Sequence, residues 1–340
     1  MKAVQIVQPN ELKIIDMPKP QIDERNNVLV KVKASGICGS DVGIYHGTNA
    51  AATYPRVIGH EIVGEIVEVG SNASTRKIGE RVIIDQVVPC GHCYACRKNR
   101  PNVCGNLQVR GVHIDGGYRE FIAVPEKDCY VLPDFLEYKD AVMIEPTTIA
   151  VQACSRAQLE SEDDVMIIGA GALGSSLLRI VKLFNPHSII VADIDEPKLD
   201  EALANGATAK INSLTEDIVA RAKELTGGYG PTVTIDAACV KGSLLNACKA
   251  AGNATRVITM GFSIASDEIN QFVITSKELD VRGSRLQNRK FGEVIKLVNE
   301  HKVNLNGAVS HTFPFMEAQK AFDFVESRDP SIRKISLIFD

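Results

Sequence analysis

Valine and isoleucine recur in short runs along the first 130 residues, and glycine bounds many of these runs. The clearest examples are NVLVKVKASGICG, EIVGEIVEVG and ERVIIDQVV. Short β-branched runs between turn residues are typical of β-strands. We therefore predict a mainly β domain over residues 1–147.

From about Thr147 the pattern changes to an alternation of helices and strands. The helix-like stretch TTIAVQACSRAQ precedes the strand VMIIG, the helix SSLLRIVKLF and the strand SIIVADI, and the alternation continues to about Arg285. Such alternation predicts a parallel sheet, here one doubly wound α/β domain over residues 148–285. Residues 286–340 hold two more amphipathic helices and a last strand, KISLIFD. We expect this tail to return to the first domain, because the doubly wound unit is complete before it.

The composition is that of a globular chain with room for about two domains. Of the 340 residues, 45% are hydrophobic and 24% are charged, and the net charge is -4. This balance disfavours nucleic acid and anionic membranes as partners. The apolar stretch Val165–Leu178 is interrupted by glycine and serine and is shorter than the roughly 20 residues of a membrane span. The N-terminus lacks the apolar core of a secretion signal, so we expect a cytoplasmic protein.

A glycine-rich turn follows the strand VMIIG and opens the next helix. It carries the pattern G-x-G-x-x-G at Gly169, Gly171 and Gly174, with Ala172 and Leu173 between the last two glycines. In this context the first glycine permits a tight turn, the second lets a pyrophosphate approach the backbone, and the third lets helix and strand pack closely. The turn therefore predicts a dinucleotide site. The alternative is that these glycines serve packing alone.

Asp193 ends the following strand, 24 positions after Gly169. A carboxylate at this spacing accepts hydrogen bonds from the adenosine ribose, which favours NAD over NADP. Asp195 lies close by and no arginine follows to neutralise a 2′-phosphate. We also expect Gly261, directly after the strand RVITM, to contact the cofactor. The alternative for Asp193 is that it only caps a turn.

Four cysteines are crowded into one segment, residues 88–106. Their spacing is C-x2-C-x2-C-x7-C, at Cys90, Cys93, Cys96 and Cys104. Four thiolates close a tetrahedron around zinc and leave no open position, which is typical of a structural site. Disulfides are disfavoured in a reducing compartment, and an iron–sulfur cluster usually shows a final x3 spacing and a proline. His92 lies inside the segment but is redundant once four sulfurs are present.

A second set of metal-binding side chains lies in three separate loops. These are Cys38 in GICGSD, His60 and Glu61 in VIGHE, and Glu145 in IEPTT. One thiolate, one imidazole and one carboxylate hold zinc with a fourth position open, as a catalytic site requires. Taken singly, Cys38 is explained as a small buried residue, His60 as a core histidine and Glu145 as a charge at a helix N-terminus.

Together these motifs resemble the zinc-dependent medium-chain dehydrogenases, and the resemblance covers essentially the whole chain. It implies a mainly β GroES-like catalytic domain, a Rossmann domain that binds NAD, and a homodimer or homotetramer. It also implies a catalytic zinc on Cys38, His60 and Glu145, with Glu61 as an alternate ligand. The four-cysteine segment matches the structural zinc lobe of this family.

The resemblance assigns further roles near these ligands. Asp41 matches the carboxylate that orients the histidine ligand, Ser40 the hydroxyl that takes the substrate proton, and Lys198 a basic residue beside the ribose. Many relatives carry histidine at the position of Gly43, and glycine cannot relay a proton. The expected relay beyond Ser40 therefore runs through Tyr45, His46 or water.

The reaction implied is hydride transfer between a hydroxyl and NAD, at the cleft between the domains. The phrases YPRVIGHE, GVHIDGG and GSR are most similar to bacterial sugar-acid dehydrogenases and starvation-sensing dehydrogenase-like proteins. We therefore expect a polyol or sugar-acid substrate. Arg56 or Arg285 is a candidate to clamp a substrate carboxylate, unless it forms a surface ion pair. His113 is a candidate for substrate hydroxyls, unless it is structural.

Three other functions are consistent with parts of this pattern. The first is a dehydrogenase of L-threonine or another small alcohol in the same family. The second is a protein that senses redox state by binding NAD(H) without turnover. The third is a zinc-ribbon interaction module, which the negative net charge disfavours.

Overall fold

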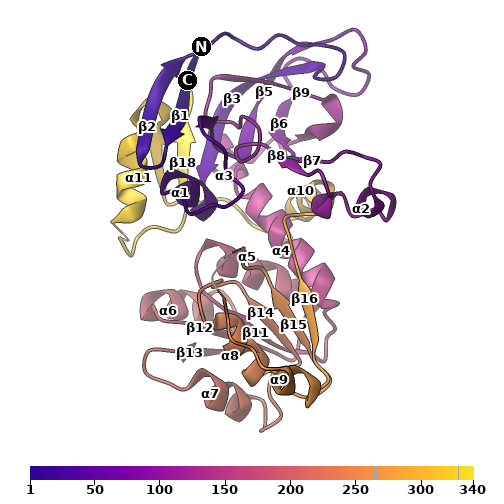
Figure 1. The fold of residues 1–340 in the computed structure, drawn as a ribbon, viewed down its shortest axis with the longest axis vertical. Helices are drawn as coiled ribbons and strands as arrows, with labels where there is room; N and C mark the ends of the chain where they lie inside the picture. The colour runs from indigo at the N-terminus through magenta and orange to yellow at the C-terminus, as the bar shows by residue number, and fades with distance from the viewer. Residues whose placement is uncertain (263–265, 328) are drawn as a thin grey trace. The chain divides into compact units, whose positions relative to one another are not determined.

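The computed structural model describes residues 1–262, 266–327 and 329–340, and it divides into two compact units. The first unit contains Met1–Glu145 and Phe291–Asp340, and the second contains Pro146–Lys290. Both ends of the chain thus belong to the first unit (Figure 1). In the described part of the chain, no helix has the length and hydrophobicity that a membrane span needs.

The first unit is built mainly from short strands. They are β1 (Lys2–Gln8), β2 (Glu11–Asp16), β3 (Val28–Ile37), β4 (Arg56–Val57), β5 (Glu61–Val69), β6 (Arg81–Ile84), β7 (Val87–Val88), β8 (Gln108–Val109), β9 (Phe121–Val124), β10 (Cys129–Val131), β17 (His311–Pro314) and β18 (Ile335–Ile338). Its helices are α1 (Gly39–Tyr45), α2 (Tyr94–Arg97), α3 (Tyr138–Ala141), α10 (Phe291–Asn299) and α11 (Ala318–Glu326). Short 3₁₀ turns are at Pro101–Val103, Glu126–Asp128 and Phe315–Glu317.

A seven-stranded sheet organises this unit, with the path β10-β6-β5-β3-β18-β17 and β9 paired to β3. Strand β3 is central and almost completely buried, so its run of valines faces protein on both sides. The last strand, β18, pairs antiparallel with β3, and Figure 1 shows this yellow strand among the indigo ones. The C-terminal residues therefore complete the sheet that the N-terminal residues begin.

The second unit is a Rossmann-like α/β fold, which confirms the predicted fold class. Its strands are β11 (Asp164–Ile168), β12 (Ser188–Asp193), β13 (Ala209–Asn212), β14 (Val233–Asp236), β15 (Arg256–Thr259) and β16 (Asp280–Gly283). Its helices are α5 (Ala172–Val181), α6 (Glu196–Ala204), α7 (Ile218–Leu225), α8 (Ser243–Ala250) and α9 (Gln271–Thr275), with a 3₁₀ turn at Lys182–Phe184. Helix α4 (Ile144–Ala157) crosses the boundary between the two units.

All strand pairs of this second sheet are parallel, in the order β13-β12-β11-β14-β15-β16. One face of the sheet buries apolar side chains such as Met166, Ile190, Ile211 and Val257 in one cluster with helix α8. The strand order reverses beside β11. Sheets of this kind bind ligands at the carboxyl ends of the strands, next to the point of reversal. The glycine turn that follows β11 lies at this edge.

Candidate active site

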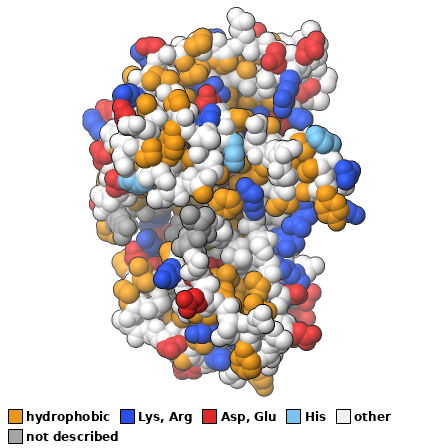
Figure 2. Space-filling view, viewed as in Figure 1, with side chains coloured by type: hydrophobic (Ala, Val, Ile, Leu, Met, Phe, Trp, Pro, Cys, Tyr) orange, Lys and Arg blue, Asp and Glu red, His pale blue; other side chains and the backbone are white. Residues whose placement is uncertain are grey.

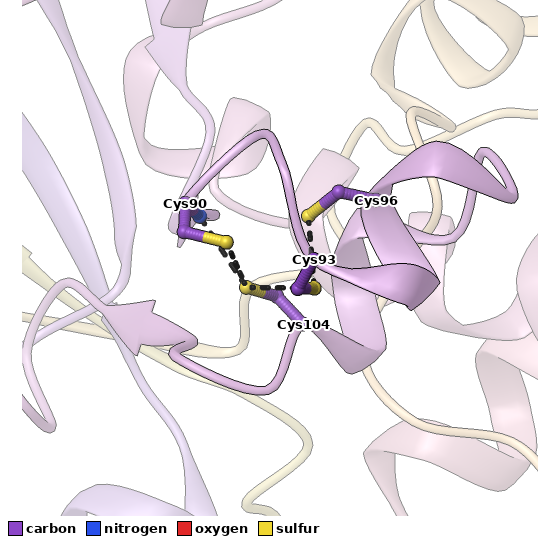
Figure 3. Close-up of side chains that lie close together, drawn as sticks. All are labelled: Cys90, Cys93, Cys96 and Cys104. Atoms are coloured by element: carbon purple, nitrogen blue, oxygen red, sulfur yellow. Dashed lines mark hydrogen bonds between the residues drawn. The ribbon is translucent and has the colours of Figure 1, made fainter.

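The four cysteines of the predicted lobe lie together (Figure 3). The Sγ atoms of Cys93 and Cys96 are 3.5 Å apart, those of Cys90 and Cys104 3.4 Å, and those of Cys93 and Cys104 3.7 Å. Disulfide sulfurs lie about 2.05 Å apart, and all nine cysteines are free thiols. A tetrahedron with Zn–S bonds of about 2.3 Å has edges of about 3.8 Å, so the lobe fits zinc.

The backbone of the lobe prepares its sulfurs for a cation. The amides of Cys90 and Asn106 both donate to Cys104 Sγ at 3.3 Å. Backbone hydrogen bonds, first that from Cys96, lower the pKa of Cys93 to about 6. His92 is exposed, and its Nδ1 lies 2.9 Å from the carbonyl oxygen of Cys90. This histidine is not among the grouped metal-binding side chains of the lobe.

A second group forms around the paired strands β3 and β5. Cys38 follows β3, Glu61 begins β5, and His60 comes directly before it. The register of these strands sets Gly36 opposite Glu61, which brings the three side chains to one place. Their ligand atoms all lie within 4.8 Å of one another, and the side chains of His60 and Glu61 are buried.

Asp41 is completely buried and links the backbone to this group. Its carboxylate accepts hydrogen bonds from the amide of Cys38 at 2.9 Å and the hydroxyl of Tyr118 at 3.4 Å. It also accepts from the amide of Gly59 at 3.3 Å, and Oδ1 lies 3.5 Å from His60 Nδ1. A carboxylate in this place restricts the orientation of the imidazole. Tyr118, which the sequence analysis did not identify, holds that carboxylate through this hydrogen bond.

Charges within the group shift the pKa values of Cys38 and His60. Burial opposes ionisation of Cys38, but the hydrogen bond and charge of His60 outweigh it and lower the thiol pKa. Burial likewise acts to lower the pKa of His60, but the Asp41 carboxylate raises it well above its ordinary value. Each of the two side chains therefore favours the charged form of the other, a thiolate and an imidazolium. With a cation bound, both side chains would bind the cation instead.

Lys334 is a buried partner that the sequence analysis missed. It comes directly before β18, and its Nζ forms an ion pair and hydrogen bond with Glu61 Oε1. Glu61 Oε2 is buried and has no hydrogen-bond partner among the residues that the structure describes. A Cβ atom at Gly36 would lie 1.8 Å from this oxygen, so the glycine makes room for the carboxylate. The only signal in the sequence was a single lysine beside an apolar strand.

Glu145 lies in the first turn of helix α4 and is buried, but it is not in the close group with Cys38, His60 and Glu61. Burial, aided by the charges of Glu61 and Cys38 and opposed by His60, raises the pKa of Glu145 to about 8. The amide of Gln86, a second residue that the sequence analysis missed, donates a hydrogen bond to Glu145 Oε1.

The expected relay residues lie on helix α1. Ser40 is half-buried there. His46 is exposed and contacts Asn10 Oδ1 at 2.9 Å and the carboxylate of Glu326. Tyr45 accepts a hydrogen bond from Gln319 at 3.4 Å. Tyr45 and His46 therefore connect α1 to the first hairpin and to α11.

Two of the substrate candidates make contacts of a structural kind. Arg56 donates to Asp115 at 2.9 Å and to Thr53 at 2.6 Å. His113 Nδ1 accepts from the amide of Val109 at 3.1 Å, closing a turn. Arg285, in the second unit, has its guanidinium 4.8 Å from the ring centre of Phe262.

The glycine turn of the second unit has the conformation that a phosphate site needs. Gly169 has φ of +102°, which favours glycine, and a Cβ atom at Gly174 would lie 1.8 Å from the Gly169 carbonyl oxygen. A Cβ atom at Gly171 would meet nothing within 4 Å. Ala172 and Leu173 form the first turn of α5, whose free amides favour an anion.

Asp193 ends β12 beside this turn. Its carboxylate accepts from the amide of Ala170 at 2.5 Å and from that of Ile194 at 2.7 Å. Lys198 Nζ lies 3.0 Å from Asp195 Oδ2, and Asp195 also caps helix α6. Gly261 is exposed after β15, close to Cys239.

Acidic and basic side chains are intermixed, among the described residues, on the face that Figure 2 shows. This agrees with the net charge of -4. On this face, the described residues form no broad positively charged surface that would bind a phosphate backbone.

Comparisons with known proteins cover both units. Residues 24–134 match the alcohol dehydrogenase GroES-like domain, and residues 172–300 match the zinc-binding dehydrogenase family. The chain is 40% identical to the starvation-sensing protein RspB of Escherichia coli, over 100% of this chain and 99% of that protein. It is 30% identical to the L-galactonate-5-dehydrogenase of Escherichia coli, over 95% of each.

Solved structures agree with this assignment. The alcohol dehydrogenase rspB of E. coli CFT073, complexed with NADH, has a TM-score of 0.93 at 40% identity and covers 100% of this chain and 99% of that one. A putative zinc-binding dehydrogenase of Sinorhizobium meliloti, bound to NADP, has a TM-score of 0.91 at 27% identity over 99% of both chains. The chain therefore belongs to the zinc-type medium-chain alcohol dehydrogenases, in their polyol and sugar dehydrogenase branch.

Proposed function

We propose that this enzyme transfers a hydride between a secondary hydroxyl of a polyol or sugar acid and NAD. The observation that carries the proposal is the group of Cys38, His60 and Glu61, whose ligand atoms lie within 4.8 Å of one another. A carboxylate oxygen of Glu61 is buried there, beside a thiol and an imidazole, and no described residue forms a hydrogen bond with it. This donor set suits zinc, and it leaves room for a further ligand.

In this proposal Cys38 and His60 hold the zinc with one carboxylate, from Glu61 or Glu145. Bound zinc supplies Lewis acidity, which lowers the pKa of a substrate hydroxyl. Asp41 holds the imidazole in one orientation through its contact with Nδ1. Ser40 receives the substrate proton, and from there we propose water as the carrier, since His46 and Tyr45 are engaged with neighbouring segments.

We propose NAD as the cofactor because of the charge beside β12. The carboxylates of Asp193 and Asp195 would repel a 2′-phosphate, and Lys198 already forms an ion pair with Asp195. The similarity to a structure complexed with NADH supports this choice. The pyrophosphate would bind the amides at the start of α5.

A sugar acid needs a cation to receive its carboxylate, and Arg285 is the candidate we propose. Arg56 already forms an ion pair with Asp115, which favours a structural role for it. Equal rates on sorbitol and a matching aldonate, before and after Arg285→Ala, would contradict the clamp. We further propose a homo-oligomer that pairs through β16, an edge strand with mostly exposed residues.

The proposed function is tested with a panel of secondary alcohols, polyols and aldonates and the absorbance of NADH. The protein is assayed as purified, after dialysis against a chelator, and after zinc is restored. We expect turnover with polyhydroxy substrates that disappears with zinc and returns with it. NADH binding without any turnover would instead favour a redox sensor, and undiminished turnover without zinc would exclude the proposed site.

A further inference from the structure

Gln86 lies between β6 and β7, at the point where the main sheet leads into the cysteine lobe. Its backbone carbonyl accepts from the amide of Arg110 at 3.0 Å, and Arg110 also donates to the carbonyl of Asp85 at 2.6 Å. The Gln86 side chain is completely buried. The backbone therefore holds this amide in one place, without any help from solvent.

The two ends of the Gln86 amide have different environments. The nitrogen donates a hydrogen bond to Glu145 Oε1. The carbonyl oxygen is buried and has no hydrogen-bond partner within the described part of the chain. A buried carbonyl oxygen without a partner is rare and unfavourable. A hydrogen-bond donor from a ligand would therefore bind favourably to this oxygen.

The position of this acceptor relates it to the metal-binding group. Glu145, to which the amide is bonded, is close enough to His60, Glu61 and Cys38 for their charges to act on it. A substrate whose hydroxyl is held at that group has its neighbouring carbon one bond farther from the group. A second hydroxyl on that carbon is a donor of the right kind for Gln86.

We propose that Gln86 has two functions: its nitrogen positions the Glu145 carboxylate, and its carbonyl oxygen selects substrates with a hydroxyl next to the one oxidised. The substrate class is therefore a vicinal diol, as in polyols and sugar acids. This inference rests on the proposed function. Gln86 acts on the substrate by a hydrogen bond and on the metal only through Glu145.

The selectivity is tested with 2,3-butanediol and 2-butanol, which differ by one hydroxyl. We expect kcat/KM of the unaltered enzyme to favour the diol by about 10-fold or more, as a directed hydrogen bond allows. In Gln86→Met, which keeps the length and removes both polar atoms, this ratio falls towards one. Gln108→Met, an exposed glutamine on β8, is the matched control and keeps the ratio.

The positioning function is tested by replacing zinc with cobalt, whose visible absorption reports the ligand geometry. In Gln86→Met we expect a changed cobalt spectrum and a loss of metal to chelator that is roughly 10- to 100-fold faster, as for other groups that support ligands. Circular dichroism and the metal content of the cysteine lobe verify folding. Gln108→Met should match the unaltered protein in both measurements.

The outcomes separate this inference from the proposed function. If the unaltered enzyme oxidises neither alcohol nor any polyol, the proposed function fails, whereas the cobalt spectrum still tests the role of Gln86 at Glu145. If the unaltered enzyme oxidises both alcohols equally, the selectivity is contradicted without any variant. An unchanged diol preference, spectrum and metal retention in Gln86→Met would overturn the inference as a whole.

Discussion

The two candidate metal sites of the first unit are built in opposite ways. The cysteine lobe takes all four sulfurs from one short segment, between Cys90 and Cys104, and its sulfurs contact one another directly. The buried group takes its side chains from the ends of strands, and Lys334, which pairs with Glu61, is 273 residues from it in sequence. One site depends on local backbone geometry and the other on the register of a whole sheet.

This difference has energetic consequences. In the lobe, backbone amides donate to Cys104 Sγ and backbone hydrogen bonds lower the pKa of Cys93 to about 6, so part of the ligand set already favours the thiolate, whereas burial raises the pKa of Cys96 to about 12. In the buried group, Lys334 and Glu61 form an ion pair in the interior, and Glu61 Oε2 has no hydrogen-bond partner among the described residues. Buried charges are tolerated only when their partners are in place. Loss of a metal-binding side chain of the buried group should therefore disturb chemistry, and loss of its ion pair should also lower stability, whereas a change in the lobe should disturb folding.

The comparison is tested most strongly by exchanging one thiol in each site. Cys38→Ser should lower kcat/KM by more than the roughly 10- to 100-fold seen when a group that only supports a metal ligand is lost, with little change in melting temperature. Cys93→Ser should release the lobe metal and lower the melting temperature instead, because structural zinc contributes directly to folding. Metal analysis, thermal melting and turnover of both variants measure this. Full turnover in Cys38→Ser would contradict the assignment of the buried group.

Local features of the sequence were predictable, and the fold class is confirmed. The spacing of four cysteines and the glycines from Gly169 to Gly174 each act within one short segment, so the pattern alone indicates the geometry. The alternation of strands and helices likewise predicts the parallel sheet. In each case the interacting residues are neighbours in sequence.

Features that depend on distant segments were not predictable in the same way. Lys334 meets Glu61 only because β18 inserts beside β3, and Gln86 meets Glu145 across 59 residues. No periodicity or composition marks either residue. Arg56 shows that a short spacing in sequence can also suggest a role that contacts do not support. Its spacing from His60 suggested a role with substrate, whereas its guanidinium contacts Asp115.

The next largest effect is expected from the buried ion pair. Lys334→Met leaves Glu61 as a buried charge without its partner, so the free energy of unfolding should fall by about 3–5 kcal/mol. The double variant Lys334→Met, Glu61→Gln should recover much of this loss. Urea unfolding of the three proteins measures the change. The exposed ion pair of Lys2 and Asp16 is the control, and Lys2→Met should cost less than about 1 kcal/mol.

The pH dependence of the metal-free protein distinguishes the two sites further. Burial raises the pKa of Glu145 from 4.5 to about 8, so the folded protein retains a proton that the unfolded chain releases. The resulting stability is complete below pH 4.5 and is lost as the pH rises through 8, on the order of a few kcal/mol. Urea unfolding after chelation measures it, and Glu145→Gln should lack this decline. A stability that rises from pH 5 to pH 8 would contradict the environment described for Glu145.

A smaller effect is expected from the carboxylate beside His60. Asp41→Ala removes the carboxylate that lies 3.5 Å from His60 Nδ1 and accepts from the amide of Cys38, and it should reduce zinc affinity or turnover by roughly 10- to 100-fold. Competition with a chromogenic chelator measures the affinity. Asp41→Asn, which keeps the size and one acceptor oxygen, should lose less. Unchanged zinc affinity and unchanged turnover in Asp41→Ala would remove the positioning role.

The smallest effect is expected at the histidine of the lobe, and it tests whether four sulfurs are sufficient there. His92 is exposed and its ring contacts only the Cys90 carbonyl among the hydrogen bonds described for it, so His92→Ala should leave zinc retention and melting temperature within error. Asp41→Ala is the contrasting variant, because both residues lie near a metal-binding thiol but only Asp41 is buried against it. Release of zinc from His92→Ala would mean that the His92 nitrogen is needed to hold the metal of the lobe. The four cysteines would then not be sufficient, and the lobe, like the buried group, would depend on a further side chain.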